Sequence, residues 1–417
     1  MSSKTWSKLS QAISERKNEV VRLTQEMVRR PSYEKEADVQ AFITQWWRER
    51  GLEPDIWEPD IEELKKSSGF VNVDYNYQGR PNQVIMLKGS GGGHSLTLNG
   101  HVDVVPVEPV SWKYGGPWNP ELHDGKIYGR GSMDMKAGIA VAMIVMDALH
   151  ESGIQLKGDL QLQCVVDEEN GGNGTLAFIR RGVKAKAAMV LEPTELAIIP
   201  AVRGAVWFTL TLYGKAGHSG NVAGRVSALD KAFEAIQIFK GYHDRLLAES
   251  RGMPLFDAFT DPMPLTIGQC EAGNWPASVP SKAVLKGLLG FLPNRSRRQV
   301  QQELRDSLRT QGDEWLREHF ELEFNMLNND GNLLPVEHPL VTGLQAALVK
   351  NGLPPTLKAQ TAACDAWQYA NTAGIPTVVF GPGSILHAHS KEEQIRLAEV
   401  LQAAQVLADF VMQKGVV

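Results

Sequence analysis

The stretch LTLNGHVDVVP, residues 96–106, decides the fold class expected of this chain. Its apolar character continues to Asn99 and Gly100, after which His101 and Asp103 stand two positions apart. Alternate residues of a β-strand point to the same side, so an imidazole and a carboxylate would face one spot at the end of this strand. An H-x-D pair on its own also fits an ordinary surface turn. Other polar side chains at the same strand end would favour a functional site over a surface turn.

Acidic and histidine residues follow several other apolar runs of the chain. Strands that alternate with helices predict an α/β fold with a mixed, mostly parallel sheet flanked by helices. In such sheets ligands bind beyond the carboxyl ends of the strands, so we expect these side chains to converge. They are Glu168 and Glu169 after LQLQCVV (160–166), Glu192 after KAAMVL (186–191), His387 and His389 after IPTVVF (375–380), and Asp134 before the apolar helix expected at 137–153.

Two further apolar runs, NQVIMLKG (82–89) and HSLTLNG (94–100), flank Ser90 and three glycines. The glycine cluster matches neither the Walker pattern nor G-x-G-x-x-G, and it precedes a strand rather than a helix, which argues against a phosphate site. We therefore expect a hairpin turn that joins these two strands.

The middle of the chain has a different pattern. Residues 205–220, AVWFTLTLYGKAGHSG, alternate as a strand with one exposed face does. From there to FELEFNML (320–327) the pattern is strand–helix–strand–strand–helix–strand, which predicts an inserted α+β domain. We place this domain at residues 202–328, between the two parts of the main domain at 1–201 and 329–417.

Composition excludes several classes of protein. A chain of 417 residues predicts two domains. Its formal charge of −5 makes nucleic acid an improbable partner. Three cysteines without CxxC spacing indicate reduced thiols. Without an apolar signal-peptide core or an apolar run near the roughly 20 residues of a membrane span, we expect a cytoplasmic protein with no membrane contact.

The residue types gathered at the strand ends suit metal chemistry. Imidazole and carboxylate without thiolate are typical of zinc, cobalt or manganese in hydrolytic sites. Two divalent cations that share a bridging carboxylate would outweigh the charge of Asp134, Glu169 and Glu192 and acidify a water molecule between them. Neighbouring side chains on extended backbone diverge, so one of Glu168 and Glu169 would bind metal and the other act as general base.

Asp103 then has a place beside the metal, where it would accept the free imidazole N–H of His101 and orient the ring. Each motif alone has a plainer interpretation. DEENGG (167–172) fits an acidic turn, LEPT (191–194) a strand-to-turn junction, and His218 in GKAGHSG a loop histidine. Their joint occurrence favours the metal site, although these arguments do not choose between His387 and His389.

Taken in order, NGHVDVVP, GKIYGRGSMDMKAG, VVDEENGG, LEPT, GKAGHSG and FGPGSILHAHSKEE resemble the motifs of the M20 metallopeptidase family, which includes deacylases and exopeptidases. The resemblance implies a zinc exopeptidase-like catalytic domain and a ferredoxin-like lid that forms a homodimer. It also implies two zinc ions and the general base Glu168. Position by position, His101, Asp134 and Glu192 would hold one ion, and Asp134, Glu169 and His389 the other.

The same resemblance assigns roles in the lid. His218 would polarise the scissile carbonyl, in many members from the partner subunit, while Asn274 and Arg203 would help to bind substrate. Many relatives also carry an Asp-x-Arg whose arginine binds a substrate carboxylate, but Leu288 and Gly290 stand at those positions here. A bidentate clamp needs a guanidinium, so an N-acylated or N-formylated amine without that carboxylate, including a heterocyclic one, becomes a candidate substrate.

We therefore expect a metal-dependent amidohydrolase that cleaves a small N-acyl or N-formyl compound. Its cofactors would be two divalent ions, zinc first and cobalt or manganese as alternatives. An exopeptidase that acts on dipeptides or on carboxy-terminal residues is the alternative within enzymes. A protein that keeps the fold but only binds a small molecule is the alternative from another class, although retention of Glu168 beside the ligands disfavours it.

Overall fold

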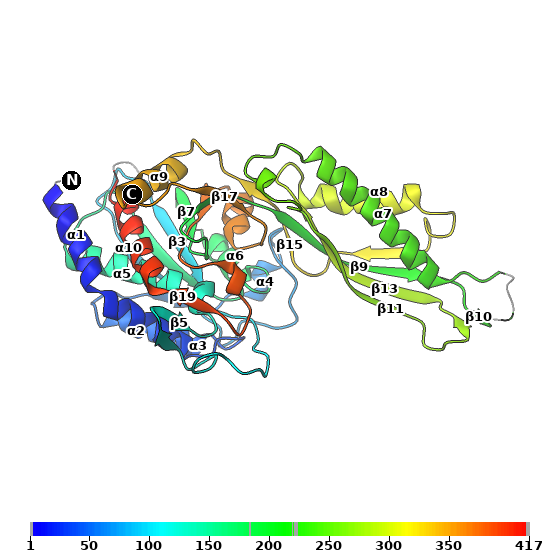
Figure 1. Cartoon of the computed structure of the whole chain (residues 1–417), viewed down its shortest axis with the longest axis horizontal. Coiled ribbons are helices and arrows are strands. Elements are labelled where there is room, and N and C mark those ends of the chain that lie inside the picture. The colour runs from blue at the N-terminus through cyan, green and yellow to red at the C-terminus, as the bar shows by residue number, and fades with distance from the viewer. Residues whose placement is uncertain (1–2, 183–184, 219, 221–223, 414–417) are drawn as a thin grey trace.

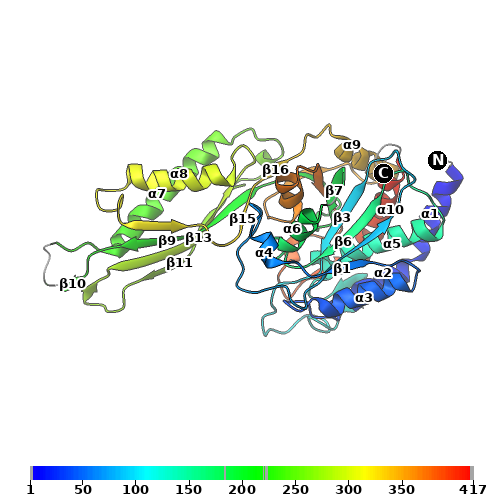
Figure 2. The ribbon, with the colours of Figure 1, turned by 180° about the vertical axis from the view of Figure 1, so that it is seen from behind.

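The structure is a computed structural model that describes residues 3–182, 185–218, 220 and 224–413. Figure 1 shows a broad α/β body that contains both ends of the described chain, joined to a longer, narrower body built on an antiparallel sheet. Figure 2 shows the same arrangement from behind. The predicted fold class, mixed α/β with a separate antiparallel-sheet domain, is confirmed.

The large sheet is parallel in its centre, and most of its outer strands pair antiparallel. The parallel centre is β6–β3–β7–β18, whereas β1, β2 and β16 pair antiparallel. Every residue of β3, β6 and β7 is buried, as expected of strands covered on both faces. The strand order is β1 (Asp55–Trp57), β2 (Asn82–Leu87), β6 (Leu160–Val165), β3 (Leu96–His101), β7 (Ala187–Val190), β18 (Thr377–Val379), β8 (Ile198–Val202) and β16 (Asn332–Leu333), with β17 (Leu357–Gln360) beside β8.

Two apolar cores cover the two faces of this sheet. Alternate residues of β7 face opposite sides, so Met189 joins the core that contains α5 while Val190 joins the core that contains Tyr369. The first core is built with α1 (Ser3–Glu15), α2 (Lys17–Val28), α3 (Ala37–Arg48), α5 (Ala137–Glu151), α9 (Pro339–Lys350) and α10 (Leu397–Val411). The second core contains Tyr369 of η3 (Gln368–Thr372), and Ile179 of α6 (Asn173–Arg180) packs against it.

The hairpin predicted between the runs at 82–89 and 94–100 is wrong. Strands β2 and β3 do not pair, because β6 lies between them and pairs with both. The segment with the glycines instead crosses the start of β6, where Ser90 N–H donates to the carbonyl of Leu156 and Gly91 N–H to that of Lys157. A connection over the sheet end is what lets β3 run parallel to β6.

The inserted sheet is antiparallel and runs β11 (Leu265–Ala272), β13 (Lys282–Phe291), β9 (Gly204–Tyr213), β14 (Phe320–Glu323), with β15 (Asn328–Asn329) also on β9. Helices α7 (Ala228–Glu249) and α8 (Arg297–Gln311) cover one face (Figure 1). In chain order the elements follow the predicted strand–helix–strand–strand–helix–strand pattern, and the first and third long strands lie in the middle, as in ferredoxin-like folds. A core of its own contains Phe208, Phe239 and Leu285.

The chain passes from one sheet to the other between β8, which ends at Val202, and β9, and returns between β15 and β16. The exact domain boundaries at 201/202 and 328/329 stay predictions. The remaining elements are short: α4 (Ile61–Leu64), β4 (Glu121–His123), β5 (Lys126–Tyr128), η1 (Ser132–Lys136), β10 (Gly217–His218), η2 (Phe256–Ala258), β12 (Ser278–Val279), η4 (Ile385–His387) and β19 (Gln394–Arg396). Within the described ranges, every helix is too short or too polar to cross a lipid bilayer, and the cytoplasmic location stays a prediction.

Candidate metal centre

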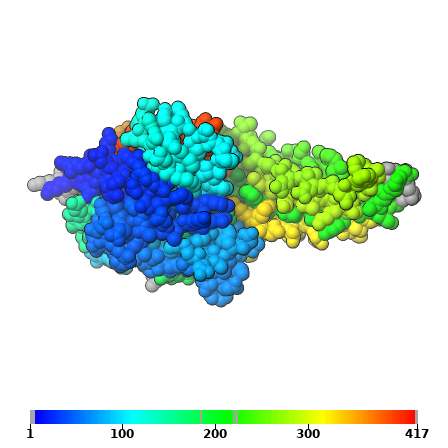
Figure 3. All heavy atoms as spheres, turned by 90° about the horizontal axis from the view of Figure 1, so that it is seen from below, coloured from blue at the N-terminus to red at the C-terminus, as the bar shows by residue number. Residues whose placement is uncertain are grey.

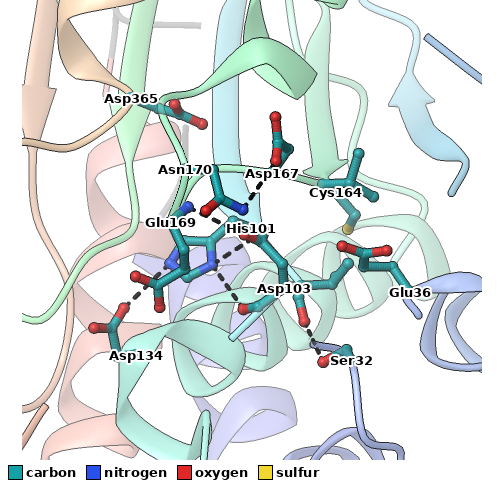
Figure 4. A network of polar contacts seen from close by, with 12 residues as sticks. Ser32, Glu36, His101, Asp103, Asp134, Cys164, Asp167, Glu169, Asn170 and Asp365 are labelled. Carbon is teal, nitrogen blue, oxygen red and sulfur yellow. Dashed lines mark hydrogen bonds and ion pairs between the residues drawn. The ribbon is translucent and has the colours of Figure 1, made fainter. Parts of the chain in front are cut away.

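Side chains from several strand ends meet at one edge of the large sheet. His101 is the last residue of β3, and Glu168, Glu169 and Glu192 follow the parallel strands β6 and β7. Because parallel neighbours end at the same edge, their terminal side chains are brought together. Figure 4 shows His101 between Asp134 and Asp103, with Glu169 on the Asp134 side.

The contacts form one group around His101 and another around His389. The Nε2 atom of His101 lies 3.1 Å from Oδ1 of Asp134 and 3.6 Å from Oε1 of Glu192. The Nε2 atom of His389 lies 3.3 Å from Oδ2 of Asp134 and 3.1 Å from Oε2 of Glu169. Since the two carboxylate oxygens of Asp134 face different imidazoles, Asp134 belongs to both groups.

The segment that carries Asp134 is held from the other side of the site. Its backbone N–H and that of Met133 donate to Oε1 of Glu393, at 3.4 and 3.3 Å. The other oxygen of Glu393 accepts from Arg130 at 2.5 Å. The Asp134–Met135 peptide bond is cis. The buried Arg130–Glu393 pair therefore helps to fix where the carboxylate of Asp134 lies.

The imidazole of His101 is oriented through its second nitrogen. Nδ1 lies 3.0 Å from the backbone carbonyl oxygen of Asp103 and 3.6 Å from its carboxylate. The carboxylate of Asp103 also accepts the backbone N–H of Glu169, at 3.1 Å. The closest partner of the ring is thus the carbonyl, whereas the sequence predicts the carboxylate, and the carboxylate links His101 to the loop that holds Glu169.

Glu168 and Glu169 have different carboxylate neighbours. Glu169 contacts His389 and groups with His101 and Asp134, whereas Glu168 groups with His101 and Glu192, with one ligand atom of each residue within 4.8 Å of the others in its group. The residue before them, Asp167, has a φ of 66°, which non-glycine residues rarely adopt outside functional sites. The buried carboxylate of Asp167 accepts hydrogen bonds from the hydroxyl groups of Tyr75 and Tyr77. These two bonds hold the turn that precedes Glu168.

The carboxylates and imidazoles strongly perturb one another. Burial raises the pKa of Glu192 well above its usual value, and the nearby Asp134 adds to this effect. Burial likewise raises the pKa of Glu168. Contacts with Asp134 and Glu169 raise the pKa of His389 to about 10. The raised pKa values of these acids show that burial and mutual repulsion disfavour their charged forms.

This donor set fits divalent cations. Each group offers an imidazole nitrogen and two carboxylate oxygens with no thiolate, the ligands that zinc, cobalt and manganese accept. His101 is fully buried and Glu192 is 6% exposed, so a cation would relieve the repulsion where water cannot. The residues present are therefore a candidate centre for two metal ions.

The lid residues lie apart from this centre within one chain. His218 is exposed in β10, at the end of the antiparallel sheet remote from β3 (Figure 1), and accepts a hydrogen bond from Gly220 N–H at 3.1 Å. Ser219 of the same motif is outside the described residues. Asn274 is exposed between β11 and β12 and lines a cavity of about 570 Å³. The structure thus joins the predicted metal ligands and Glu168, but not His218 or Asn274.

Arg203 is buried at the passage from β8 to β9. Its guanidinium donates to the carbonyls of Thr361 and Gly204, the latter at 3.2 Å. A Cβ atom at Gly290 would lie 2.9 Å from Nη1 of Arg203, closer than real Cβ contacts come. The guanidinium of Arg203 therefore packs against Gly290 and would have to shift if position 290 carried a side chain.

The sequence analysis did not predict two buried acidic residues near the site, Glu393 and Asp365. Glu393 closes the motif FGPGSILHAHSKEE, so its place in the motif was a usable signal. Asp365 is buried near the same carboxylates, where Thr175 Oγ1 donates to it at 2.5 Å and burial raises its pKa to about 7. No local pattern marks Asp365, because its partners come from distant segments.

The model of peptidase family M20/M25/M40 matches residues 97–413. The N-formyl-4-amino-5-aminomethyl-2-methylpyrimidine deformylase of Bacillus subtilis (strain 168) is 29% identical, covering 97% of this chain and 96% of the relative. An acetylornithine deacetylase of Salmonella arizonae is 27% identical over 82% of this chain and 88% of its own length.

Among solved structures, a tripeptidase from Staphylococcus aureus subsp. aureus Mu50 is similar with a TM-score of 0.75. It is 21% identical, and the match covers 95% of this chain and 97% of the tripeptidase. At this identity the likeness shows the shared fold and does not extend to the substrate.

Proposed function

The chain belongs to peptidase family M20/M25/M40, and from that premise we propose that it is a dimetal amide hydrolase that removes a small acyl group from an amine. The observation that carries the proposal is the pair of ligand groups that share Asp134, with Glu168 beside them and free of His389. Relatives that are deacylases, matched over most of their length, support the reaction type.

The contacts support the proposed metal ligands. His101, Asp134 and Glu192 would hold one ion, and Asp134, Glu169 and His389 the second. Zinc is the first candidate, with cobalt or manganese as alternatives. When bound, such ions supply Lewis acidity toward the amide carbonyl and toward water.

Glu168 is the proposed general base. It takes a proton from the attacking water as the new C–O bond forms, and returns that proton to the departing nitrogen as the C–N bond breaks. Burial that raises its pKa favours holding the proton between these steps. His218 of a second chain would donate to the carbonyl oxygen as negative charge develops there.

The substrate is proposed to be a formylated aminomethylpyrimidine. Gly290 has no side chain, so the arginine clamp for a substrate carboxylate is missing there. The deformylase relative acts on a substrate whose name contains no carboxylate and matches almost the whole chain. Acetylornithine, which has a carboxylate, is the second candidate, since its deacetylase also matches.

Amine release from a substrate panel tests this proposal. We expect metal-loaded protein to hydrolyse N-formyl-4-amino-5-aminomethyl-2-methylpyrimidine with a kcat/KM at least about tenfold above that for acetylornithine, because a missing guanidinium penalises the carboxylate. Dipeptides serve as the control for exopeptidase activity. Faster release from dipeptides would contradict the deacylase proposal and establish the exopeptidase alternative.

A homodimer would bring His218 to the centre. Strand β11 is an edge strand with mostly exposed residues, the kind of edge that pairs with a second copy. Asn274 lies at the same remote end of the lid, and we propose that it reaches substrate in the same way. Arg203 already lies at the passage between the sheets.

Complementation tests the exchange of His218. Glu168→Gln and His218→Ala chains should each be nearly inactive alone, since each lacks one essential group. Co-expressed, they should recover about a quarter of wild-type activity, because half of randomly assembled dimers hold one intact centre. If His218 acts within its own chain, the mixture will show no recovery, and light scattering that reports an active monomer would also rule out the exchange.

A further inference from the structure

The backbone is anchored on both sides of Glu168, the proposed general base. On the carboxyl side, the backbone N–H of Glu169 donates to the carboxylate of Asp103 at 3.1 Å. On the amino side stands Asp167, which is fully buried and has a φ of 66°. A non-glycine residue keeps such a conformation only where surrounding contacts hold it. The contacts of Asp167 therefore bear on the place of the residue that follows it.

The carboxylate of Asp167 accepts hydrogen bonds from four side chains. The hydroxyl group of Tyr75 donates to Oδ1 and that of Tyr77 to Oδ2, the latter at 2.6 Å. Nδ2 of Asn170 lies 3.2 Å from Oδ1, and Nδ2 of Asn173 lies 3.3 Å from Oδ2. Figure 4 shows Asn170 pointing toward Asp167. Two donors on each oxygen leave this carboxylate little freedom to move.

A buried cation supports the same carboxylate. Arg80 is 6% exposed, and its Nε and Nη2 atoms donate to the two oxygens of Glu36 at 2.8 and 2.6 Å. Its Nη2 atom also lies 3.8 Å from Oδ1 of Asp167. The guanidinium lies over the rings of Tyr75 and Tyr77, 4.6 and 5.6 Å from their centroids. Figure 3 shows the blue N-terminal segments and the light-blue segment that follows them side by side on one face of the α/β body.

We propose that Asp167 is a positioning residue for Glu168, and that the donors to its carboxylate set the rate of turnover through it. The inference rests on the proposed function, in which Glu168 carries the proton. Asp167 is fully buried, so it acts through its neighbour and not on the substrate. A catalytic group misplaced by about 1 Å can lose about a hundredfold in rate. Because Asp103 holds Glu169 independently, a disturbance at Asp167 reaches Glu168 first.

Tyr77→Phe tests the role, because it removes one donor to Asp167 and keeps the ring. We expect kcat to fall about tenfold and KM to change less than about twofold, with the metal content of the protein unchanged. Tyr242→Phe is the matched control. Tyr242 is 1% exposed, as Tyr77 is, and donates to a carboxylate oxygen of Glu303 in the lid at 2.7 Å. This control should lower the melting temperature of metal-free protein by a similar amount and leave kcat unchanged.

Combination with Glu168→Gln separates a positioning role from a merely structural one. If Tyr77 acts through Glu168, Tyr77→Phe should change the single-turnover rate of the Glu168→Gln protein by less than about twofold. A tenfold fall in both backgrounds would overturn the inference. Loss of metal from Tyr77→Phe, measured by elemental analysis, would also overturn it, because the network would then act on Glu169.

Tyr75→Phe repeats the test at the other oxygen of Asp167, should Tyr77→Phe fail to fold. Wild-type kcat in the tyrosine variants, together with a strongly impaired Glu168→Gln, would overturn the positioning role and leave the deacylase proposal intact. Wild-type turnover by Glu168→Gln would instead overturn the proposed general base, and the positioning role with it.

Discussion

Glu168→Gln is expected to lower kcat by about 10²–10⁴-fold, the usual contribution of a general acid–base group, while the protein retains its full metal content. The amide has nearly the shape of the carboxylate but cannot take up a proton from water. Glu168 groups with His101 and Glu192 but is not needed for either imidazole–carboxylate contact of Asp134. Loss of the proton acceptor should therefore leave the ligands in place.

The neighbouring residue supplies the matched comparison. Glu169→Gln removes a carboxylate that lies 3.1 Å from His389, so we expect it to lower metal content as well as turnover. Glu62→Gln, exposed in α4, should change neither. Elemental analysis and steady-state kinetics on all three variants separate the roles. Normal turnover by Glu168→Gln would show that another group carries the proton.

The structure explains why the candidate ligands could be predicted from the sequence. His101, Glu169 and Glu192 each stand at the end of an apolar run or within three residues after it, and parallel strands end at a common edge. Local pattern and sheet geometry together therefore suffice to predict their convergence. The order of elements in the inserted domain was predictable for the same reason, since alternation along β9 and the helical runs of α7 and α8 are local signals.

The features that the sequence did not predict correctly depend on contacts between distant segments. The partner of both β2 and β3 is β6, which begins about sixty residues after β3, so proximity in sequence wrongly favoured a hairpin. Likewise, the guanidinium that packs against Gly290 of β13 belongs to Arg203, which lies between β8 and β9. No pattern within either segment carries this information.

The backbone conformation at two site positions could not be predicted from the sequence either. Asp167 and His389 both have positive φ, 66° and 58°, although neither is glycine. Such conformations persist only where surrounding contacts hold them, and Tyr75 and Tyr77 do so for Asp167. The turn before Glu168 is thus specified by tyrosines about ninety residues earlier, which sequence reasoning did not connect with the site.

Asp134→Ala is expected to abolish binding of both metal ions and to reduce activity to the level of protein treated with a chelator. One oxygen of Asp134 lies 3.1 Å from His101 and the other 3.3 Å from His389, so its removal takes one ligand from each group. By contrast, His101→Ala and His389→Ala each remove a ligand from one group, and each should retain up to one ion per chain.

Thermal unfolding measures this without reference to turnover. A cation that binds only the folded chain stabilises it by about 2.7 kcal/mol at a hundredfold excess over its Kd, so zinc should raise the melting temperature of chelated wild-type protein. The Asp134→Ala variant should show no such rise, and the two histidine variants a smaller one. Because each variant is compared with its own chelated form, a change in basal stability does not enter the comparison. If Asp134→Ala still binds two ions per chain with an undiminished rise, the shared carboxylate is not the bridge, and the ligand assignment around it is wrong.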